Sequence, residues 1–304
     1  MSYTAFLKSL STAFGIGLLG VPLLIYGVRS FQRPPQTNLE RSLFQGVAYK
    51  REYRPVPRPL MLHIVTIDLN APGIRVLVTP GTPASDQRET NARTPSEFLN
   101  EFNLQLAINA NFFYPFREKT PWDYYPHSGD RVNAVGQAIS NQLPYSSPQS
   151  SFPALCFSDR PLAQIGVGGT CPDGTAQAVA GSSLLVSQGK PVPIPKGAAD
   201  SNGLYSRTGV GLDQQGKKIW IVAIDDKQPF YSEGVTLEEL AGIFVSLGVY
   251  NALNLDGGGS TTLAISTSTG PQLLNAPIHT KVPMRERPVA NHLGFYALPA
   301  ERGK

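Results

Sequence analysis

Short apolar runs separated by glycine and proline recur along the chain from residue 60 onward, and this spacing constrains the fold more than any other feature. The runs are rich in β-branched residues, which is typical of strands: LMLHIVTIDL, GIRVLVT, QLAIN, LLVS, KKIWIVAID, YNALNLD, TTLAIS and HLGFYAL. Of the 304 residues, 29 are glycine and 27 are proline, and this supply of turn formers argues against a helical bundle. No repeat indicates a solenoid or a fibre.

Two segments interrupt the strand pattern with helix signals. The first begins at the N-cap residue Thr94, with a proline next and Glu97 at the capping-box position. The second begins at Thr236, with Glu239 at the box position, and apolar residues at helical spacing lead to Gly248. Because strands outnumber helices, we expect an α+β fold. It would be a single domain with a mixed, mostly antiparallel β-sheet core and few helices, preceded by an N-terminal membrane segment.

The amino end carries twenty uncharged residues, SLSTAFGIGLLGVPLLIYGV, between Lys8 and Arg29. A helix of that length spans about 30 Å of hydrocarbon. Its glycines and proline would weaken a buried helix in water, whereas membrane helices tolerate them. We therefore expect residues 1–29 to form a transmembrane or signal-anchor segment, with residues 9–28 in the membrane. No A-x-A site follows, and a cleaved signal peptide with secretion of the domain is the alternative.

The positive charge of the chain lies close to that segment. Residues 29–58 hold seven basic and two acidic residues, and Lys8 precedes them, so the net charge of +4 leaves −2 for residues 59–304. A body of that charge is a poor binder of nucleic acid. We expect residues 30–58 to be a basic, proline-containing linker and residues 59–304 to be one folded domain outside the cytoplasm, in the periplasm or at the cell surface. Arg29 and Arg33 argue against this location, because the positive-inside rule places basic residues next to a membrane segment in the cytoplasm.

Cys156 and Cys171 are the two cysteines of the chain. They flank two apolar runs joined by turn residues, which is compatible with a bridge within one hairpin-like unit. Two buried free thiols are the alternative. Export of the domain favours the disulfide.

Residues 254–262 read NLDGGGSTT and form the most pointed motif. A strand delivers the carboxylate of Asp256 to its end, and three glycines follow at once. Glycines allow positive φ and let backbone N–H groups approach an anion closely. The motif lacks the Gly-Lys-Ser/Thr of a P-loop, and a plain glycine-rich turn is the alternative.

Paired amides close another strand at Asn109 and Asn111. Side-chain amides at a strand end bind sugar hydroxyls or an oxyanion, or they satisfy turn backbone. Seven of the fourteen residues 112–125 are aromatic; exposed rings would offer platforms to sugar faces, and burial against the sheet is the alternative.

Three further segments carry charged side chains beside turns: SRTGVG with Arg207, residues 221–236 with Asp226 and Ser232, and RERPVANH with Glu286 and Arg287. Arginine is a planar clamp for phosphate, and a neighbouring glutamate suits acid–base chemistry. The four histidines have no zinc-ligand spacing.

Taken in order, NxNFF, SRTGVG, SxGVTLxELA, NLDGGGSTT and ERPVANHLG resemble the phosphodiester glycosidase family, which includes the lysosomal uncovering enzyme that removes N-acetylglucosamine from a phosphodiester. The resemblance covers residues 60 to 298 and implies hydrolysis of a sugar-1-phosphodiester, in bacteria commonly of envelope or exopolysaccharide glycans. These residues fall on the family's motif positions: Asn111, Arg207, Asp226, Ser232, Asp256, Gly257, Gly258, Ser260, Thr261, Glu286 and Arg287.

The chain departs from the family pattern at three places. Asn111 stands where the family usually has glycine, Asp225-Asp226-Lys227 replaces Asp-Gly, and the aromatic segment after Phe113 is peculiar to this chain. These departures bear on the identity of the substrate.

The resemblance implies a mechanism. Arg207 and Arg287, with the amides of residues 257 to 259 (Gly257, Gly258 and Gly259), would hold the phosphodiester oxygens. Asp256 and Glu286 would be the acid and the base or nucleophile. No cofactor is called for, and a divalent cation stays open.

Two other functions remain open: a catalytically silent glycan-binding protein of exopolysaccharide assembly, and a metal-dependent phosphodiesterase with Asp225, Asp226 and Asp256 around a cation.

Overall fold

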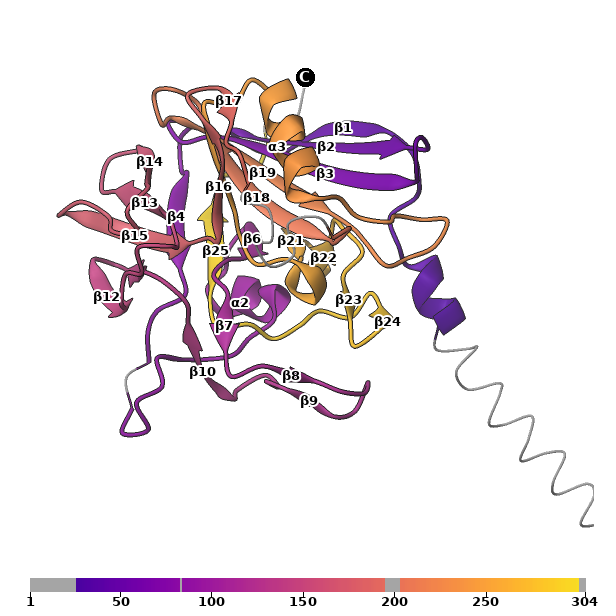
Figure 1. The fold of residues 1–304 in the computed structure, drawn as a ribbon, viewed down its shortest axis with the longest axis horizontal. Helices are drawn as coiled ribbons and strands as arrows, with labels where there is room; N and C mark the ends of the chain where they lie inside the picture. Colours follow the sequence, from indigo (N-terminus) through magenta and orange to yellow (C-terminus); the bar gives the residue numbers. More distant parts are fainter. Residues whose placement is uncertain (1–25, 83, 195–202, 301–304) are drawn as a thin grey trace, which may run out of the picture.

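A computed structural model describes residues 26–82, 84–194 and 203–300 (Figure 1). The predicted membrane segment, residues 9–28, lies outside the described residues except for its last three. In the part of the chain that is described, no helix combines the length and the apolar character needed to cross a bilayer.

The largest sheet has eight strands. Alternate residues of its strand β3 point to opposite faces, so Val65 and Ile67 enter one apolar cluster, whereas Leu62 and Ile64 enter another. The order is β1 (Leu39–Phe44), β2 (Val47–Arg54), β3 (Leu60–Asp68), β19 (Lys218–Ile224), β18 (Arg207–Leu212), β20 (Asn251–Asn254), β16 (Ser183–Ser187) and β17 (Lys190–Pro191).

A second, five-stranded sheet packs against one face of the first. Leu106, Ile108 and Leu293 from this sheet share an apolar cluster with Val65 and Ile221 from the eight-stranded sheet, so the main core lies between the two sheets. The order of the second sheet is β22 (Gly270–Leu273), β21 (Leu263–Thr267), β6 (Leu106–Asn109), β25 (His292–Tyr296) and β4 (Arg75–Val78).

A third sheet of five strands forms the lobe beside β4 at the left of Figure 1. Its order is β12 (Leu143–Ser146), β11 (Ala138–Ser140), β15 (Thr175–Ala180), β13 (Ala154–Ser158) and β14 (Ala163–Gly166). The short remaining strands are β5 (Thr90–Asn91), β10 (Arg131–Ala134), β7 (Phe113–Tyr114), β8 (Arg117–Glu118), β9 (Tyr124–Tyr125), β23 (Ile278–His279) and β24 (Val282–Pro283).

Two helices cover the outer faces of the two large sheets. Helix α3 (Leu237–Ser246) buries Leu240 and Phe244 on the eight-stranded sheet, and α2 (Pro95–Glu101) buries Phe98 on the second sheet. Both predicted capping boxes are present, at the N-caps Thr94 and Thr236. The predicted single domain with few helices is therefore confirmed.

The predominance of antiparallel pairing that we expected is confirmed, and the two large sheets are antiparallel throughout, without the parallel pairs of a mixed sheet. The chain passes from β19 through α3 to β20, a connection that suits parallel neighbours. However, β18 lies between β19 and β20 and pairs antiparallel with each. Helix α3 therefore joins two strands, β19 and β20, that run in the same direction but are not neighbours in the sheet.

The structure differs from the expectation of a linker over residues 30–58, because residues 39–54 form β1 and β2. Strand β2 pairs with β3 from Val47 opposite Ile67 to Arg54 opposite Leu60. Buried and exposed residues alternate along the first part of β2, with Val47, Tyr49 and Arg51 buried. The charged residues of this strand hide the alternation in the sequence. Arg51 is tolerated because its guanidinium donates to the backbone oxygen of Thr37 and to its hydroxyl, each at 2.9 Å.

The predicted disulfide between Cys156 and Cys171 is confirmed, with 5.7 Å between the two Cα atoms. It ties β13 to the loop after β14 and packs with Ile139, Ala154 and Ala178 in the core of the third sheet.

Candidate active site

The glycine motif carries the chain from one large sheet to the other, since it joins β20 to β21 through the short 3₁₀ helix η1 (Gly258–Ser260). The buried amide of Asn109 fixes both ends of this crossing. Its Nδ2 donates to the backbone oxygen of Asp256 at 2.6 Å, and its Oδ1 accepts from the N–H of Thr262 at 3.1 Å. Asn109 thus holds the backbone of the site, and its contact with substrate stays a prediction.

The glycines of the crossing meet a conformational need at Gly258 and a close contact at Gly259. Gly258 has a φ of +58°, a left-handed conformation. A Cβ at Gly259 would collide with the guanidinium of Arg287. The N–H of Gly257 donates to Asp256 Oδ1 at 2.9 Å, and that of Gly258 donates to the backbone oxygen of Ser206 at 2.8 Å. Two of the amides expected to cradle an anion are therefore engaged within the protein.

Asp256 is a nearly buried carboxyl group at the start of this crossing, with 8% of its surface exposed. Burial raises its pKa to about 6, against the charge of Arg287 and hydrogen bonds from Ser260 and the Gly257 N–H, which lower it. A carboxyl group with such a pKa can carry a proton near neutral pH and give it up again.

Arg287 joins Asp256 to the rest of the site. Its Nη1 donates to Ser260 Oγ at 3.1 Å, its Nη2 donates to Glu118 Oε2 at 2.7 Å, and its Nε lies 3.2 Å from His279 Nδ1. The guanidinium also lies 4.5 Å from the ring centroid of Phe116. The structure therefore brings together Asp256, Ser260 and Arg287, three of the residues that the sequence analysis placed in the site.

Glu118 and His279 are members of this network that the sequence did not reveal. The hydrogen bond with His279 and the charge of Arg287 lower the pKa of Glu118 to about 2, although burial opposes them. Burial lowers the pKa of His279, and its Nε2 is buried without a hydrogen-bond partner among the described residues. Glu118 lies on the β8–β9 hairpin, within the aromatic segment. An acidic residue among aromatic residues was the sequence signal that could have identified it as a site residue.

A cavity of about 560 Å³ opens beside this network. Gly259, Arg287 and Glu118 line it, together with the loops at residues 227–229 and 278–283 and part of the 26–33 segment. Four of its lining side chains are cationic and one is anionic, so it suits an anionic ligand: Arg33, Lys227, Lys281, Arg287 and Glu118.

Glu286 occupies a different environment. Its carboxylate accepts a hydrogen bond from the N–H of Ser96 at 3.0 Å, in the first turn of α2. Burial raises its pKa, and the contact with Ser96 opposes that rise. Within the described ranges no hydrogen bond or ion pair joins Glu286 to Asp256 or Arg287, so its catalytic role stays a prediction.

Arg207 lies at the start of β18 on the face that α3 covers. Its Nε donates to the backbone oxygen of Val235 at 3.3 Å, its Nη2 donates to that of Gly203 at 3.2 Å, and its guanidinium lies 5.2 Å from the Tyr205 ring. The next residue, Thr208, points to the opposite face and donates to Asn109 Oδ1. The Tyr205 ring that Arg207 contacts also contacts the cavity residue Lys227.

Asn111 and Ser232 are buried and bonded to the protein. Asn111 Oδ1 accepts from the Ala180 N–H at 2.8 Å and from Asn291 Nδ2 at 3.0 Å. Ser232 Oγ donates to the backbone oxygen of Asp225 at 2.5 Å. These side chains support the fold around the site, and a contact with substrate stays a prediction.

Asp226 and Thr261 are the predicted residues whose buried side-chain oxygens have no well-aligned hydrogen-bond partner in the described ranges. Burial raises the pKa of Asp226, while nearby Ser206 and Lys227 oppose the shift.

The three carboxylates of the metal-site alternative have different surroundings. Asp225 accepts from His63 Nε2 at 3.1 Å and from Asn275 Nδ2 and the Ala276 N–H at 3.0 Å each. Over the described part of the chain, no group of three or more His, Cys, Asp or Glu side chains is placed to hold a metal ion.

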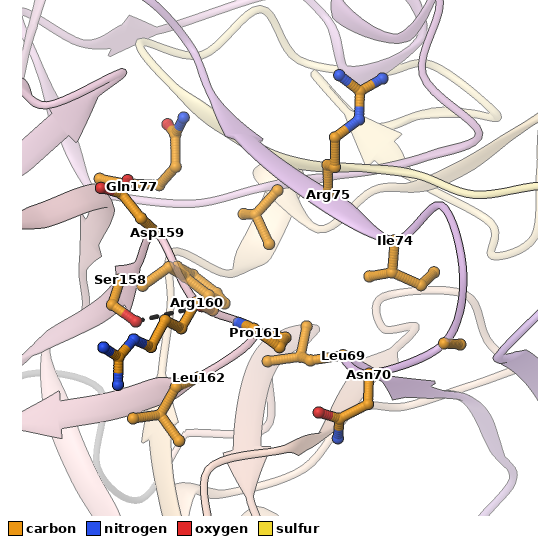
Figure 2. A pocket seen from close by; sticks show the side chains of 14 residues that line it. Leu69, Asn70, Ile74, Arg75, Ser158, Asp159, Arg160, Pro161, Leu162 and Gln177 are labelled. Atoms are coloured by element: carbon orange, nitrogen blue, oxygen red, sulfur yellow. Dashed lines mark hydrogen bonds between the residues drawn. The ribbon is translucent and has the colours of Figure 1, made fainter.

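A second cavity, of about 440 Å³, lies between the turn after β3 and the turn of the β13–β14 hairpin (Figure 2). Arg75, Asp159 and Arg160 are among its charged lining residues, and Ser158 Oγ donates to the backbone oxygen of Arg160 at 3.1 Å. None of the predicted site residues lines it.

Comparisons with known proteins agree with this picture. Residues 102–296 match the profile of the phosphodiester glycosidase family. A hypothetical protein from Synechocystis has a similar structure, with a TM-score of 0.61 and 18% identity, over 83% of this chain and 62% of that one. The catalytic domain of zebrafish N-acetylglucosamine-1-phosphodiester alpha-N-acetylglucosaminidase, auto-inhibited by its pro-peptide, has a TM-score of 0.59 and 17% identity, over 89% of this chain and 87% of that one. No curated protein sequence matches.

Proposed function

Because the chain belongs to the phosphodiester glycosidase family, we propose that it hydrolyses a sugar-1-phosphodiester in the cavity beside Gly259 and Arg287. The observation that carries the proposal is one continuous network. In it, the buried carboxyl group of Asp256 and the guanidinium of Arg287 share Ser260, and Arg287 lines a cavity with mostly cationic walls.

Each group has a role in breaking the bond between the anomeric carbon and oxygen. Arg287 binds the phosphoryl oxygens. The phosphate leaves with the electron pair of the C–O bond and takes the proton of Asp256, while water adds its hydroxyl to the carbon and its remaining proton restores Asp256. Glu118, held ionised, stabilises the positive charge that develops on the sugar ring. Two carboxyl groups with pKa values pushed apart are the usual arrangement for this chemistry.

The aromatic segment supports a sugar as the substrate. Trp122 is 83% exposed and Phe116 is 47% exposed, on and beside the hairpin that carries Glu118. Flat exposed rings suit the apolar faces of sugars. We further propose an envelope or exopolysaccharide glycan as substrate and a membrane-anchored, extracytoplasmic location. The family resemblance and the uncharged run at residues 9–28 support these two points.

The proposal is tested by incubating the purified full chain with N-acetylglucosamine-1-phosphate methyl diester, with and without a chelator. We expect release of free sugar at the same rate in both. Turnover that a chelator abolishes and Mg²⁺ restores would favour the metal-dependent phosphodiesterase. Sugar binding without turnover, unchanged by Asp256→Asn, would favour the silent glycan-binding protein.

A further inference from the structure

Two loops that line the cavity together with Gly259 have an unusual backbone. Of the ten described residues other than glycine that have positive φ, five lie in residues 227–230 and 280–284. Such conformations cost about 1–3 kcal/mol each and persist at functional sites. Two of these five residues, Lys227 and Lys281, line the cavity, and the other three lie in the same loops: Phe230, Thr280 and Met284.

The β23–β24 hairpin shows the strain most clearly. Its two turn residues, Thr280 and Lys281, have φ of +52° and +62°, the left-handed pair that a type I′ turn requires and that Asn-Gly usually supplies. The side chain of Thr280 is bonded on both sides, since its Oγ1 donates to the His279 backbone oxygen at 2.7 Å and accepts from Arg285 Nη1 at 3.0 Å. Lys281 has no such contact in the described structure, and it lines the cavity.

Lys227 repeats this situation in the other loop. It has a φ of +52° where glycine would be unstrained, and it lines the same cavity. Its Nζ lies 5.1 Å from the Tyr205 ring centroid. Neither Lys227 nor Lys281 forms an ion pair within the described ranges, whereas Arg287 is paired with Glu118 and Arg33 is packed on Tyr231. Two strained lysines thus add positive charge to the cavity without an ion pair in the described ranges, and the charge of Lys227 also acts on the buried Asp226, where it opposes the rise in pKa.

We propose that Lys227 and Lys281 form a second phosphate subsite beside Arg287, so that the cavity takes a sugar joined through a diphosphate. This inference rests on the proposed function and specifies its substrate class. A single phosphodiester carries one negative charge, which Arg287 can hold, whereas a diphosphate diester carries two and uses the lysines as well. The bond broken is still that between the anomeric carbon and oxygen, and the whole diphosphate departs with its electron pair while water supplies the hydroxyl.

Binding of inorganic pyrophosphate and inorganic phosphate to the full chain, measured by calorimetry, tests the subsite without relying on turnover. We expect pyrophosphate to bind about tenfold more tightly than phosphate, a difference of about 1.4 kcal/mol. The double variant Lys227→Gln, Lys281→Gln should lose that preference and bind phosphate as before. The matched control is Lys190→Gln, Lys217→Gln, which removes the same charge from exposed positions outside the cavity and should behave like the parent.

A second variant separates binding from folding. Lys281→Gly relieves the left-handed strain, so it should retain or raise the melting temperature and still lose part of the pyrophosphate preference. Equal affinity of the parent for the two anions, or an equal loss for both in the lysine variants, would overturn the subsite.

Turnover then distinguishes this inference from the proposed function. A sugar nucleoside diphosphate should be hydrolysed with a kcat/KM about tenfold above that of the methyl phosphodiester. If the methyl diester is hydrolysed equally well and the anions bind alike, the subsite is wrong and the proposed function stands. If neither is hydrolysed while pyrophosphate binding depends on the two lysines, the subsite stands and the proposed function is wrong.

Discussion

Replacing Asp256 with asparagine is expected to lower kcat by about 10²–10⁴-fold, because the variant keeps the shape of the side chain and removes the proton that the leaving phosphate takes. Folding should survive, since the amide oxygen of the introduced asparagine would still accept the Gly257 N–H. The matched variant is Glu286→Gln, which changes the carboxylate bound to Ser96. If Glu286 stabilises the first turn of α2 and takes no part in the reaction, Glu286→Gln should lower the melting temperature and leave kcat within about threefold.

The pH profile checks the same assignment. Because burial raises the pKa of Asp256 to about 6, the protonated form is lost as the pH rises through that value. We therefore expect the rate to fall about tenfold per pH unit above it. Asp256→Asn should remove this limb. A loss of rate in Glu286→Gln as large as that in Asp256→Asn, with the alkaline limb intact in Asp256→Asn, would assign the proton to Glu286 instead.

Asp225→Ala is expected to lower the free energy of unfolding by about 3–5 kcal/mol, which is large against the stability of a typical domain. The fully buried carboxylate accepts from His63, Asn275 and the Ala276 N–H, and all three donors would lose their partner. Asn275 in turn donates to the Thr261 backbone oxygen. The loss of Asp225 should therefore also destabilise the segment between β20 and β21 that carries the active-site residues. Denaturant unfolding measures it.

The neighbouring carboxylate supplies the control for that measurement. Asp226 is also buried, and burial raises its pKa, so Asp226→Asn should change the unfolding free energy by less than about 1 kcal/mol or stabilise the fold. A loss at Asp226 equal to that at Asp225 would show that burial of either position, and not the hydrogen bonds of Asp225, determines stability.

Local signals in the sequence predicted most of the fold. Apolar runs such as KKIWIVAID became the strands of the two large sheets, and the Thr94 and Thr236 capping boxes became helix starts. Strands β1 and β2 were missed because charged residues occupy their exposed face. The mostly antiparallel order was predicted. The expected parallel admixture is absent from the two large sheets because β18 lies between β19 and β20, a long-range arrangement that no local sequence pattern shows.

The site was predicted only in part, for a similar reason. Residue type and motif position indicated Asp256, Ser260 and Arg287, which the structure brings together. An amide at a strand end has the same chemistry whether it meets a substrate or the backbone, so the sequence could not show that Asn109 holds the Asp256 and Thr262 backbone. Glu118 and His279 lie 161 positions apart (279 − 118), and only folding places them on Arg287.

Hydrolysis in ¹⁸O-labelled water tests the central claim most directly, because it shows which atom water attacks. The purified chain is given N-acetylglucosamine-1-phosphate methyl diester in H₂¹⁸O, and both products are analysed by mass spectrometry. A glycosidase that uses Asp256 and Arg287 as proposed breaks the bond between the anomeric carbon and oxygen, so the label should appear in the sugar and be absent from the phosphate. Label in the phosphate product, with unlabelled sugar, would show attack at phosphorus and contradict the account.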